Sequence, residues 1–338
     1  MKILVTGATG FLGSHLSGAL VRQGHQPFLA GRNFARVKPL LAQGANAVPL
    51  DLRDRAQVIA ACAGMDLIYH VGALSTAWGD PADFAAINVE GTRAVADGAL
   101  HHGVGRLIYV SSPAVVFAGR DQQNIMEDQP YPPRFSSPYA ATKKRGEDLV
   151  NEAHTRGLPT VILRPKAIFG PGDRALLPRL IARARAGRLP QLGDGTNRVD
   201  LTYVDNVVHA LLLAAAAPRA VGKTYFITND EHIPLWPTIR AVLEQLKLST
   251  QLRPLPTPVA LTLAWLLEQR ARYTGQEPLL TRYTVGILAR TQTYDIRAAR
   301  QDLGYQPHCT VAEGIAQTLR MWASDAPTTT GSVGGATA

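Results

Sequence analysis

Tyr139 and Lys143 stand four residues apart, at the start of a stretch expected to be helical, and the pair could move a proton. An α-helix has about 3.6 residues per turn, so the two side chains would share one face, with the Lys143 ammonium beneath the Tyr139 phenol. A free tyrosine titrates near a pH of about 10, too high for a base at neutral pH. A neighbouring cation, such as this ammonium or an oxidised nicotinamide ring, favours the phenolate. The spacing alone also fits an ordinary surface helix.

The first residues of the chain could bind the dinucleotide that carries such a ring. Residues 3–5 form a short apolar run typical of a buried parallel strand, and residues 11–22 have the apolar spacing of a helix. Gly7, Gly10 and Gly13 lie between and at the start of these elements. Glycines in such a turn let the backbone approach a pyrophosphate, whose charge then lies at the helix N-terminus. The spacing is G-x-x-G-x-x-G rather than G-x-G-x-x-G, and a tight turn without a ligand is the alternative.

Arg32 follows the second expected strand, residues 26–30, where NAD-binding proteins usually carry an acidic residue that accepts from the ribose hydroxyl. An arginine could instead bind a 2′-phosphate, so this position favours NADP over NAD. The alternative is a solvated Arg32 in a protein that accepts either cofactor. Asp51 and Leu52 close the third expected strand, residues 47–50, and are placed to contact adenine.

Strands alternate with helices through residue 164, which predicts an α/β fold. The later expected strands are residues 66–69, 106–110 and 160–163. Alternation of this kind predicts a doubly wound parallel sheet, a Rossmann fold, with a smaller C-terminal substrate domain. The expected divisions are a dinucleotide-binding domain at 1–170, to which 198–230 partly returns, a substrate domain at 171–324 and a disordered tail at 325–338.

The motifs of this chain resemble those of the extended short-chain dehydrogenases/reductases, in order along nearly the whole sequence. They are T-G-A-T-G-F-L-G at 6–13, D-L at 51–52, Y-H-V-G-A at 69–73, N-V-E-G-T at 88–92, Y-V-S-S at 109–112, Y-A-A-T-K at 139–143 and L-R-P-K-A-I-F-G-P-G-D at 163–173. The resemblance implies that Ser112, with Ser111 as the alternative, is the catalytic hydroxyl. It also implies that Tyr139 moves the proton and Lys143 holds the nicotinamide ribose. Asn88 would steady the fold near the site.

The same resemblance, together with the arguments above, assigns the cofactor contacts. They are Gly7, Thr9, Gly10, Phe11, Leu12, Gly13, Arg32, Asp51, Leu52, Val71, Gly72, Ala73, Tyr139, Lys143, Pro165 and Ile168. The backbone from Pro165 to Ile168 would face the nicotinamide amide. Lys166, within that segment, could pair with a substrate carboxylate, or it could reach solvent or the cofactor.

The second half of the chain is similar to the 3β-hydroxysteroid dehydrogenase branch. The similar segments are residues 170–180, 193–208 and 225–236, and they look especially like sterol-4-carboxylate 3-dehydrogenases and bacterial 2-alkyl-3-oxoalkanoate reductases. The resemblance implies an NAD(P)-dependent dehydrogenase/reductase acting on a hydrophobic secondary alcohol or ketone. A 3β-hydroxysteroid or a long-chain β-hydroxy or β-keto acid is the expected substrate.

A nucleotide-sugar epimerase or dehydratase with tightly bound NAD is the alternative function. Those enzymes carry R-D-F-x-Y-V-D, whose arginine grips the phosphate of the sugar nucleotide. Val199 stands in the place of that arginine in the segment V-D-L-T-Y-V-D. Arg198 comes one residue earlier and, on a strand, would point to the other face. This departure favours the dehydrogenase reading.

The charge and composition of the chain limit the kinds of partner that it is expected to bind. The 338 residues carry a net charge of +9, and Arg174, Arg179, Arg183, Arg185 and Arg188 crowd one segment. That segment could be a solvated face, could attract anionic substrate and cofactor, or could dock on acidic lipid or an acidic partner. No nucleic-acid module accompanies the charge, so nucleic acid is not an expected partner. Cys62 and Cys309 lack the spacing of a disulfide framework or a metal site.

Residues 259–267 form a dense apolar run that is too short to span a membrane. We expect a buried helix here; a lining for an apolar pocket and a surface element in peripheral contact with a membrane are the alternatives. Because the first strand starts at the N-terminus, we expect no signal peptide and a cytoplasmic protein. The family resemblance implies a homodimer built from helices near residues 81–102 and 137–155.

Overall fold

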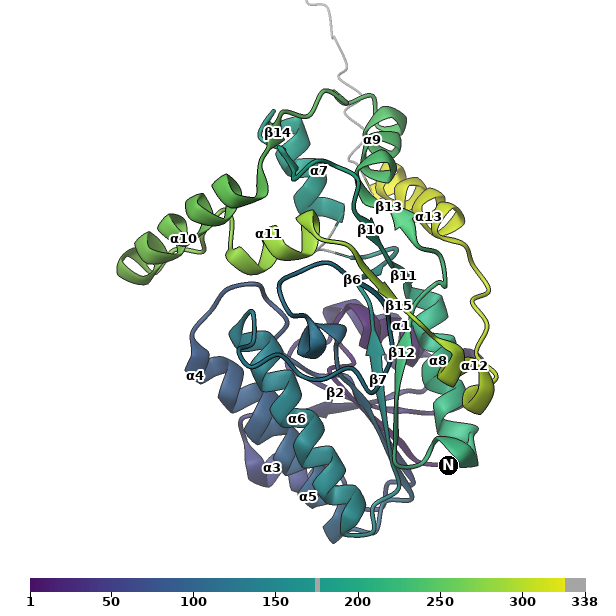
Figure 1. Cartoon of the computed structure of the whole chain (residues 1–338). Coiled ribbons are helices and arrows are strands. Elements are labelled where there is room, and N and C mark those ends of the chain that lie inside the picture. Colours follow the sequence, from purple (N-terminus) through teal and green to yellow (C-terminus); the bar gives the residue numbers. More distant parts are fainter. Residues whose placement is uncertain (174–176, 326–338) are drawn as a thin grey trace, which may run out of the picture.

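The computed structural model describes residues 1–173 and 177–325, and within them a parallel sheet forms the centre of the fold (Figure 1). Its strands, from one edge to the other, are β12 (Lys223–Ile227), β7 (Thr160–Pro165), β5 (Arg106–Val110), β4 (Leu67–His70), β1 (Ile3–Thr6), β2 (Phe28–Gly31) and β3 (Asn46–Pro49). Every neighbouring pair is parallel. The order reverses at β1, because β2 and β3 lie on one side and β4 on the other. The predicted doubly wound parallel sheet is confirmed.

Helices cover both faces of this sheet because its strands are apolar on both faces. Alternate residues of β1 point in opposite directions: Val5 packs in the cluster that includes α1 (Phe11–Arg22) and α8 (Val204–Ala216), whereas Leu4 packs in a second cluster. The second cluster is covered by α3 (Arg55–Ala61), α5 (Gly91–His101) and α6 (Pro138–Thr155). Figure 1 shows these three helices side by side at the lower left.

The helix expected near residues 81–102 is not continuous. It consists of α4 (Pro81–Phe84), a π-helical segment (Ala85–Glu90) and α5. The π-helical segment carries Asn88, whose amide accepts from Leu74 N at 2.7 Å and donates to Leu74 O at 2.9 Å and to Thr142 Oγ1 at 3.1 Å. π-Helical turns are frequent at functional sites. Asn88 therefore joins the loop after β4 to the first turns of α6, the role that the resemblance implies.

The C-terminal part adds further helices and several small sheets. Its helices are α7 (Leu177–Arg185), α9 (Leu235–Gln245), α10 (Thr257–Thr274), α11 (Arg282–Ala289), α12 (Arg297–Leu303) and α13 (Val311–Asp325). One small sheet has four strands, in the order β13 (Ile233–Pro234), β10 (Arg198–Val199), β15 (Gln292–Tyr294) and β6 (Gln122–Ile125). Two further sheets have two strands each: β11 (Thr202–Tyr203) pairs with β8 (Ile168–Phe169), and β14 (Pro254–Leu255) pairs with β9 (Gln191–Leu192). A short α2 (Lys38–Ala42) completes the N-terminal part.

The apolar run at 259–267 is not a buried helix, so that expectation is wrong. It lies in α10, where the side chains of Val259, Trp265 and Leu266 are about half exposed. The buried positions of α10 are the small residues Ala260, Ala264 and Ala271, together with Glu268, because this helix packs on α11 along one narrow face. Figure 1 shows α10 extending away from the rest of the molecule. No helix in the described residues is both long and apolar enough to cross a membrane.

The basic segment at 174–188 is partly used in internal contacts. Arg179 forms an ion pair with Glu277 at 2.9 Å, and Arg183 donates to the carbonyl of Leu279. Both contacts connect α7 to the segment that follows α10. Arg174 lies outside the described residues, as does the tail expected to be disordered, apart from Asp325 at the end of α13.

Candidate active site

A cavity of about 840 Å³ opens where the carboxyl ends of the parallel strands meet, on both sides of the reversal at β1. This is the position at which doubly wound sheets bind ligands. All the residues predicted from the sequence as catalytic or cofactor-binding line it. They are Gly7, Thr9, Gly10, Phe11, Leu12, Gly13, Arg32, Asp51, Leu52, Val71, Gly72, Ala73, Ser112, Tyr139, Lys143, Pro165 and Ile168. The structure therefore brings together residues spread over most of the N-terminal half of the chain.

The glycine turn forms one end of the cavity, and its backbone requires glycine. Gly7 has a φ of +66°, and a Cβ there would clash with the backbone of Gly72. A Cβ on Gly13 would overlap the carbonyl of Gly7. Gly10 caps α1 without any side-chain hydrogen bond, so the N-terminus of α1 is left to a ligand. This bare helix end and close-packed turn fit a pyrophosphate.

Tyr139 lies in the first turn of α6, at the other end of the same cavity. The helix begins there because Ser137 accepts a hydrogen bond from Ala140 N at 3.2 Å and is followed by Pro138. Ser112 comes from the end of β5, and its hydroxyl is hydrogen-bonded to Tyr139. Burial raises the pKa of Tyr139, and the hydrogen bond with Ser112 opposes that rise. In the protein alone Tyr139 is therefore a phenol.

Lys143 lies one turn farther along α6 and is almost fully buried, with 2% of its surface exposed. Its ammonium donates to the carbonyl of Val110 at 2.7 Å and lies 4.1 Å from the centre of the Tyr109 ring. Burial lowers the pKa of Lys143 to about 7, although the charge of Glu147 acts in the opposite direction. In the protein alone, burial has a larger effect on the pKa of Tyr139 than any neighbouring cation.

The two adjacent serines have different surroundings. Ser111 is buried and donates to Glu147 Oε1 at 2.6 Å, so its hydroxyl hydrogen is used inside the fold. Ser112 is half-buried and accepts from Ala114 N at 3.2 Å, which leaves its hydroxyl hydrogen for Tyr139 or a ligand oxygen. The structure thus brings Ser112, rather than Ser111, to the hydroxyl of Tyr139.

A buried ion pair behind the site was missed from the sequence. Arg164 on β7 donates from Nε and Nη2 to the two carboxylate oxygens of Glu147, each at 2.8 Å, and both side chains are at most 3% exposed. Tyr131 donates to Glu147 Oε2 at 3.1 Å and accepts from Arg164 at 2.9 Å. The sequence did carry one signal for Glu147. Tyr139, Lys143 and Glu147 follow each other at intervals of four along α6, so all three side chains lie on one face of the helix.

The C-terminal part supplies the remaining wall of the cavity. Tyr283 and Ile287 come from α11, Gln292 from β15, and Lys166 from the segment after β7. Of these only Lys166 had been singled out, because the other three lie outside every motif and similar segment named from the sequence. Arg36, which follows β2 and donates to the carbonyl of Gly172, also lines the cavity and was not anticipated.

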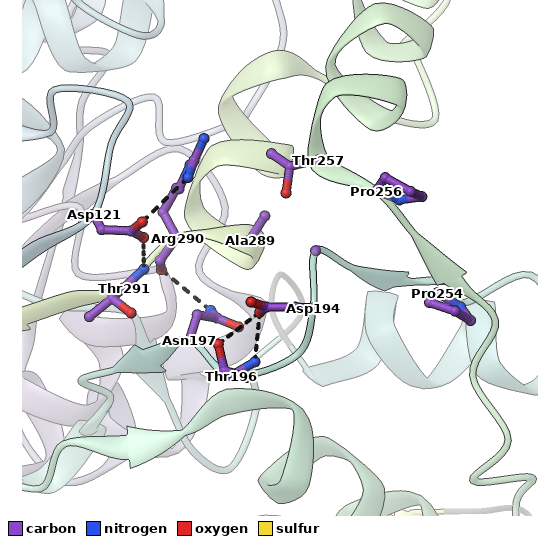
Figure 2. A pocket seen from close by; sticks show the side chains of 11 residues that line it. Asp121, Asp194, Thr196, Asn197, Pro254, Pro256, Thr257, Ala289, Arg290 and Thr291 are labelled. Atoms are coloured by element: carbon purple, nitrogen blue, oxygen red, sulfur yellow. Dashed lines mark hydrogen bonds and ion pairs between the residues drawn. The ribbon is translucent and has the colours of Figure 1, made fainter.

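A second cavity, of about 470 Å³, lies in the C-terminal part (Figure 2). Asp194 accepts from Thr196 N at 3.0 Å and from Thr196 Oγ1 at 2.8 Å, and Asp121 accepts from Thr291 N at 2.7 Å. Asp194 therefore shapes its own loop, whereas Asp121 ties its loop to the segment at Thr291. None of the residues predicted to act in catalysis or cofactor binding lines this cavity. The larger cavity is the candidate active site.

The chain belongs to the NAD dependent epimerase/dehydratase family, whose model matches residues 3–228. That range covers the glycine turn and the Ser112, Tyr139 and Lys143 site. The predicted resemblance to extended short-chain dehydrogenases/reductases is thus confirmed, and the chain is an NAD(P)-dependent oxidoreductase.

The names of two relatives match the two enzyme classes that the motifs resemble. A 2-alkyl-3-oxoalkanoate reductase of Stenotrophomonas maltophilia is 39% identical over 324 residues, with 93% of this chain and 97% of the relative covered. A decarboxylating sterol-4-alpha-carboxylate 3-dehydrogenase of Candida albicans is 35% identical over 342 residues, covering 94% and 96%. Among solved structures, a double mutant of the dTDP-glucose 4,6-dehydratase DesIV from Streptomyces venezuelae, with NAD bound, has a TM-score of 0.79 at 25% identity, covering 96% of this chain and 98% of that one. These likenesses confirm the fold class.

Proposed function

We propose that this oxidoreductase transfers a hydride between NAD(P) and a hydrophobic secondary alcohol or ketone, with a 3β-hydroxysteroid or a long-chain β-hydroxy or β-keto acid as substrate. The observation that carries the proposal is that Ser112, Tyr139 and Lys143 line the same cavity as the glycine turn. The names of both relatives describe a reacting carbon 3 next to a carbon that carries a carboxylate. Apolar and aromatic side chains on the substrate side, such as Ile287 and Tyr283, suit such a substrate.

The proposed roles follow from the contacts of each side chain. A bound nicotinamide supplies or accepts the hydride. Tyr139 takes the hydroxyl proton in oxidation and returns it to the carbonyl oxygen in reduction. Ser112, already hydrogen-bonded to Tyr139, donates to the same substrate oxygen and stabilises the negative charge that develops on it. Lys143, held by the Val110 carbonyl, binds the nicotinamide ribose.

The proposed cofactor contacts divide along the cavity. Gly7, Gly10 and Gly13 would receive the pyrophosphate at the N-terminus of α1, and Asp51 with Leu52 would contact adenine. The remaining contacts are Thr9, Phe11, Leu12, Val71, Gly72, Ala73 and the backbone from Pro165 to Ile168, which would face the nicotinamide amide.

NADP is the proposed cofactor, on the strength of Arg32. Its side chain is 69% exposed at the mouth of the cavity, and its guanidinium lies 3.9 Å from Asp51. Asp51 is already engaged by Arg53 at 2.6 Å, and this hydrogen bond lowers the pKa of Asp51 to about 2. Arg32 is therefore only loosely held and can turn to a 2′-phosphate. Arg36, another arginine along this wall, adds positive charge.

Replacing Arg32 with alanine should weaken NADP binding selectively. A hydrogen bond to a charged group contributes about 1.5–3 kcal/mol, which corresponds to an increase in KM for NADP of about tenfold or more. KM for NAD should change little, because NAD has no 2′-phosphate. Arg53→Ala is the matched control, since Arg53 also pairs with Asp51 but does not line the cavity. Equal losses for the two cofactors in Arg32→Ala would contradict the assignment.

Steady-state spectrophotometry tests the proposed reaction. Purified protein is mixed with NAD⁺ or NADP⁺ and, separately, with a 3β-hydroxysteroid, a 2-alkyl-3-hydroxy fatty acid or UDP-glucose, and the absorbance of the reduced nicotinamide is followed. Reduction with either hydrophobic alcohol, faster with NADP⁺, supports the proposal. Conversion of UDP-glucose to UDP-galactose at constant absorbance, with no reaction of the other compounds, would overturn it.

The nucleotide-sugar alternative has weaker support. Val199 is 3% exposed and packs in the core of the C-terminal part, whereas Arg198 is exposed and donates to the carbonyl of His232. Neither side chain lines the cavity, so this strand contributes no arginine for a sugar-nucleotide phosphate. The fold alone does not separate the two functions, since both occur on it.

The remaining proposals concern assembly and location. We propose a cytoplasmic homodimer that associates through the helices near residues 81–102 and 137–155, where α5 packs against α6. We also propose that α10 makes a peripheral membrane contact through its exposed side chains, including Val259, Trp265 and Leu266. Light scattering of the purified protein tests the dimer, and cosedimentation with acidic liposomes tests the membrane contact.

A further inference from the structure

Lys166 occupies a fixed position on the substrate side of the cavity. Its backbone N–H donates to Ile227 O at 3.0 Å, and its carbonyl accepts from Thr202 Oγ1 at 2.6 Å. The next residue, Ala167, has a φ of +43°, so the chain turns sharply here. These contacts hold the Lys166 side chain on the wall formed with the C-terminal part, and it lines the cavity together with Gln292 and Tyr283.

The ammonium of Lys166 has no carboxylate partner within the described part of the chain. It donates to Gln292 Oε1 at 2.7 Å and lies 5.4 Å from the centre of the Tyr294 ring. The negative charge of Asp200 acts on the pKa of Lys166, but the two carboxylate oxygens of Asp200 already accept hydrogen bonds from His232 Nδ1 at 2.6 Å and from Tyr294 N at 2.7 Å. A lysine ammonium has three N–H donors, of which one is used here. A cation held in this way is available to an anionic ligand.

Gln292 supplies a second donor beside this cation. Lysine can only donate, so the amide oxygen of Gln292 must face Lys166 and its NH₂ group must face away. The residue is 1% exposed, and its Nε2 has no hydrogen-bond partner among the described residues. An unsatisfied buried donor is costly and calls for an explanation. A ligand acceptor that reaches Gln292 through the cavity would supply one.

We propose that Lys166 and Gln292 form the site that binds the carboxylate of the substrate and so selects β-hydroxy or β-keto acids over neutral alcohols and ketones. This inference rests on the proposed function. A carboxylate has two acceptor oxygens, which match one ammonium and one amide N–H. Because Lys166 and Tyr139 line the same cavity, a substrate with its carboxylate one carbon from the reacting carbon can engage both ends.

A pair of substrates that differ only in charge tests this site. Initial rates are measured for a 2-alkyl-3-hydroxy fatty acid and for its methyl ester with the full-length wild type, Lys166→Met, Lys166→Arg and Gln292→Met. We expect Lys166→Met to raise KM for the acid by about tenfold to a hundredfold, with a smaller change in kcat and no change in KM for the ester. Lys166→Arg should recover part of the affinity, and Gln292→Met should lose less than Lys166→Met.

Lys144→Met is the matched control, because Lys144 lies on α6, pairs with Asp148 and does not line the cavity. It should leave KM for both compounds unchanged. If Lys166→Met raises KM for acid and ester equally, or changes KM for NADP instead, Lys166 serves the cofactor or the fold and the inference fails. Melting temperatures of all variants show whether a loss of affinity reflects unfolding. If Lys166→Met is unstable, the comparison of acid and ester is made with Lys166→Arg.

Calorimetry in the presence of NADP⁺ separates this inference from the proposed reaction. If neither compound is oxidised, but the acid binds more tightly than the ester and Lys166→Met removes the difference, the carboxylate site stands and the proposed reaction falls. If wild type binds acid and ester equally, the carboxylate site falls whatever the outcome for turnover.

Discussion

Tyr139→Phe should lower kcat by about 10²–10⁴-fold, the range that a positioned acid or base contributes. The substitution removes one hydroxyl, which is the group that exchanges a proton with the substrate oxygen and bonds Ser112. The ring remains to fill the same space in the first turn of α6, so the helix start at Ser137 and the position of Lys143 should persist. The dissociation constant for NADP should therefore stay within about threefold of wild type.

The measurement pairs steady-state rates with fluorescence titration of NADPH. Tyr283→Phe is the matched control, because Tyr283 lines the same cavity and lies close enough to Tyr139 for that residue to raise the pKa of Tyr283, but it is not the partner of Ser112. It should retain most of the wild-type kcat. A Tyr139→Phe variant with a rate near that of wild type, or with lost NADPH binding and residual turnover, would remove Tyr139 from the role of acid and base.

Local patterns predicted the sheet and the cofactor end of the site because their causes are local. Gly13 is required because a Cβ there would overlap the carbonyl of Gly7, six residues earlier, and Gly7 has the positive φ of a tight turn. The helix expected at residues 11–22 has the bounds of α1, since its apolar spacing matches one buried face. Expected strands were off by one or two residues at their ends, as at β2 and β3, where no side-chain signal marks the boundary.

The substrate end of the site depends on tertiary contacts that no local pattern records. Lys166 and Gln292 are separated by 126 residues, and their hydrogen bond exists only because β15 lies beside the segment after β7. The pKa of Tyr139 depends on tertiary structure for a related reason: the sequence shows which charge is nearby but does not show how deeply the phenol is buried. The exposure of α10 likewise depends on what packs against it, and its apolar run alone predicted burial.

Arg164→Met should destabilise the fold by about 3–5 kcal/mol, the usual cost of breaking a buried ion pair by removing one partner. Glu147 would then lie 1% exposed without its guanidinium, with only the hydroxyls of Ser111 and Tyr131 as donors. Guanidinium chloride unfolding, followed by circular dichroism, measures this loss. Arg179→Met is the matched control: its ion pair with Glu277 is about half exposed, so its loss should cost less than about 1 kcal/mol.

The double variant Glu147→Leu/Arg164→Met separates the ion pair from simple loss of packing. Removing both charges leaves no unpaired buried ion, so this protein should regain a large part of the stability lost in Arg164→Met. Its activity should nevertheless stay low, because Glu147 holds Ser111 beside Ser112 and its charge favours the protonated form of Lys143 one turn earlier on α6. Full recovery of both stability and kcat would show that the pair serves neither purpose, whereas recovered stability with reduced kcat would assign it to the positioning of the site.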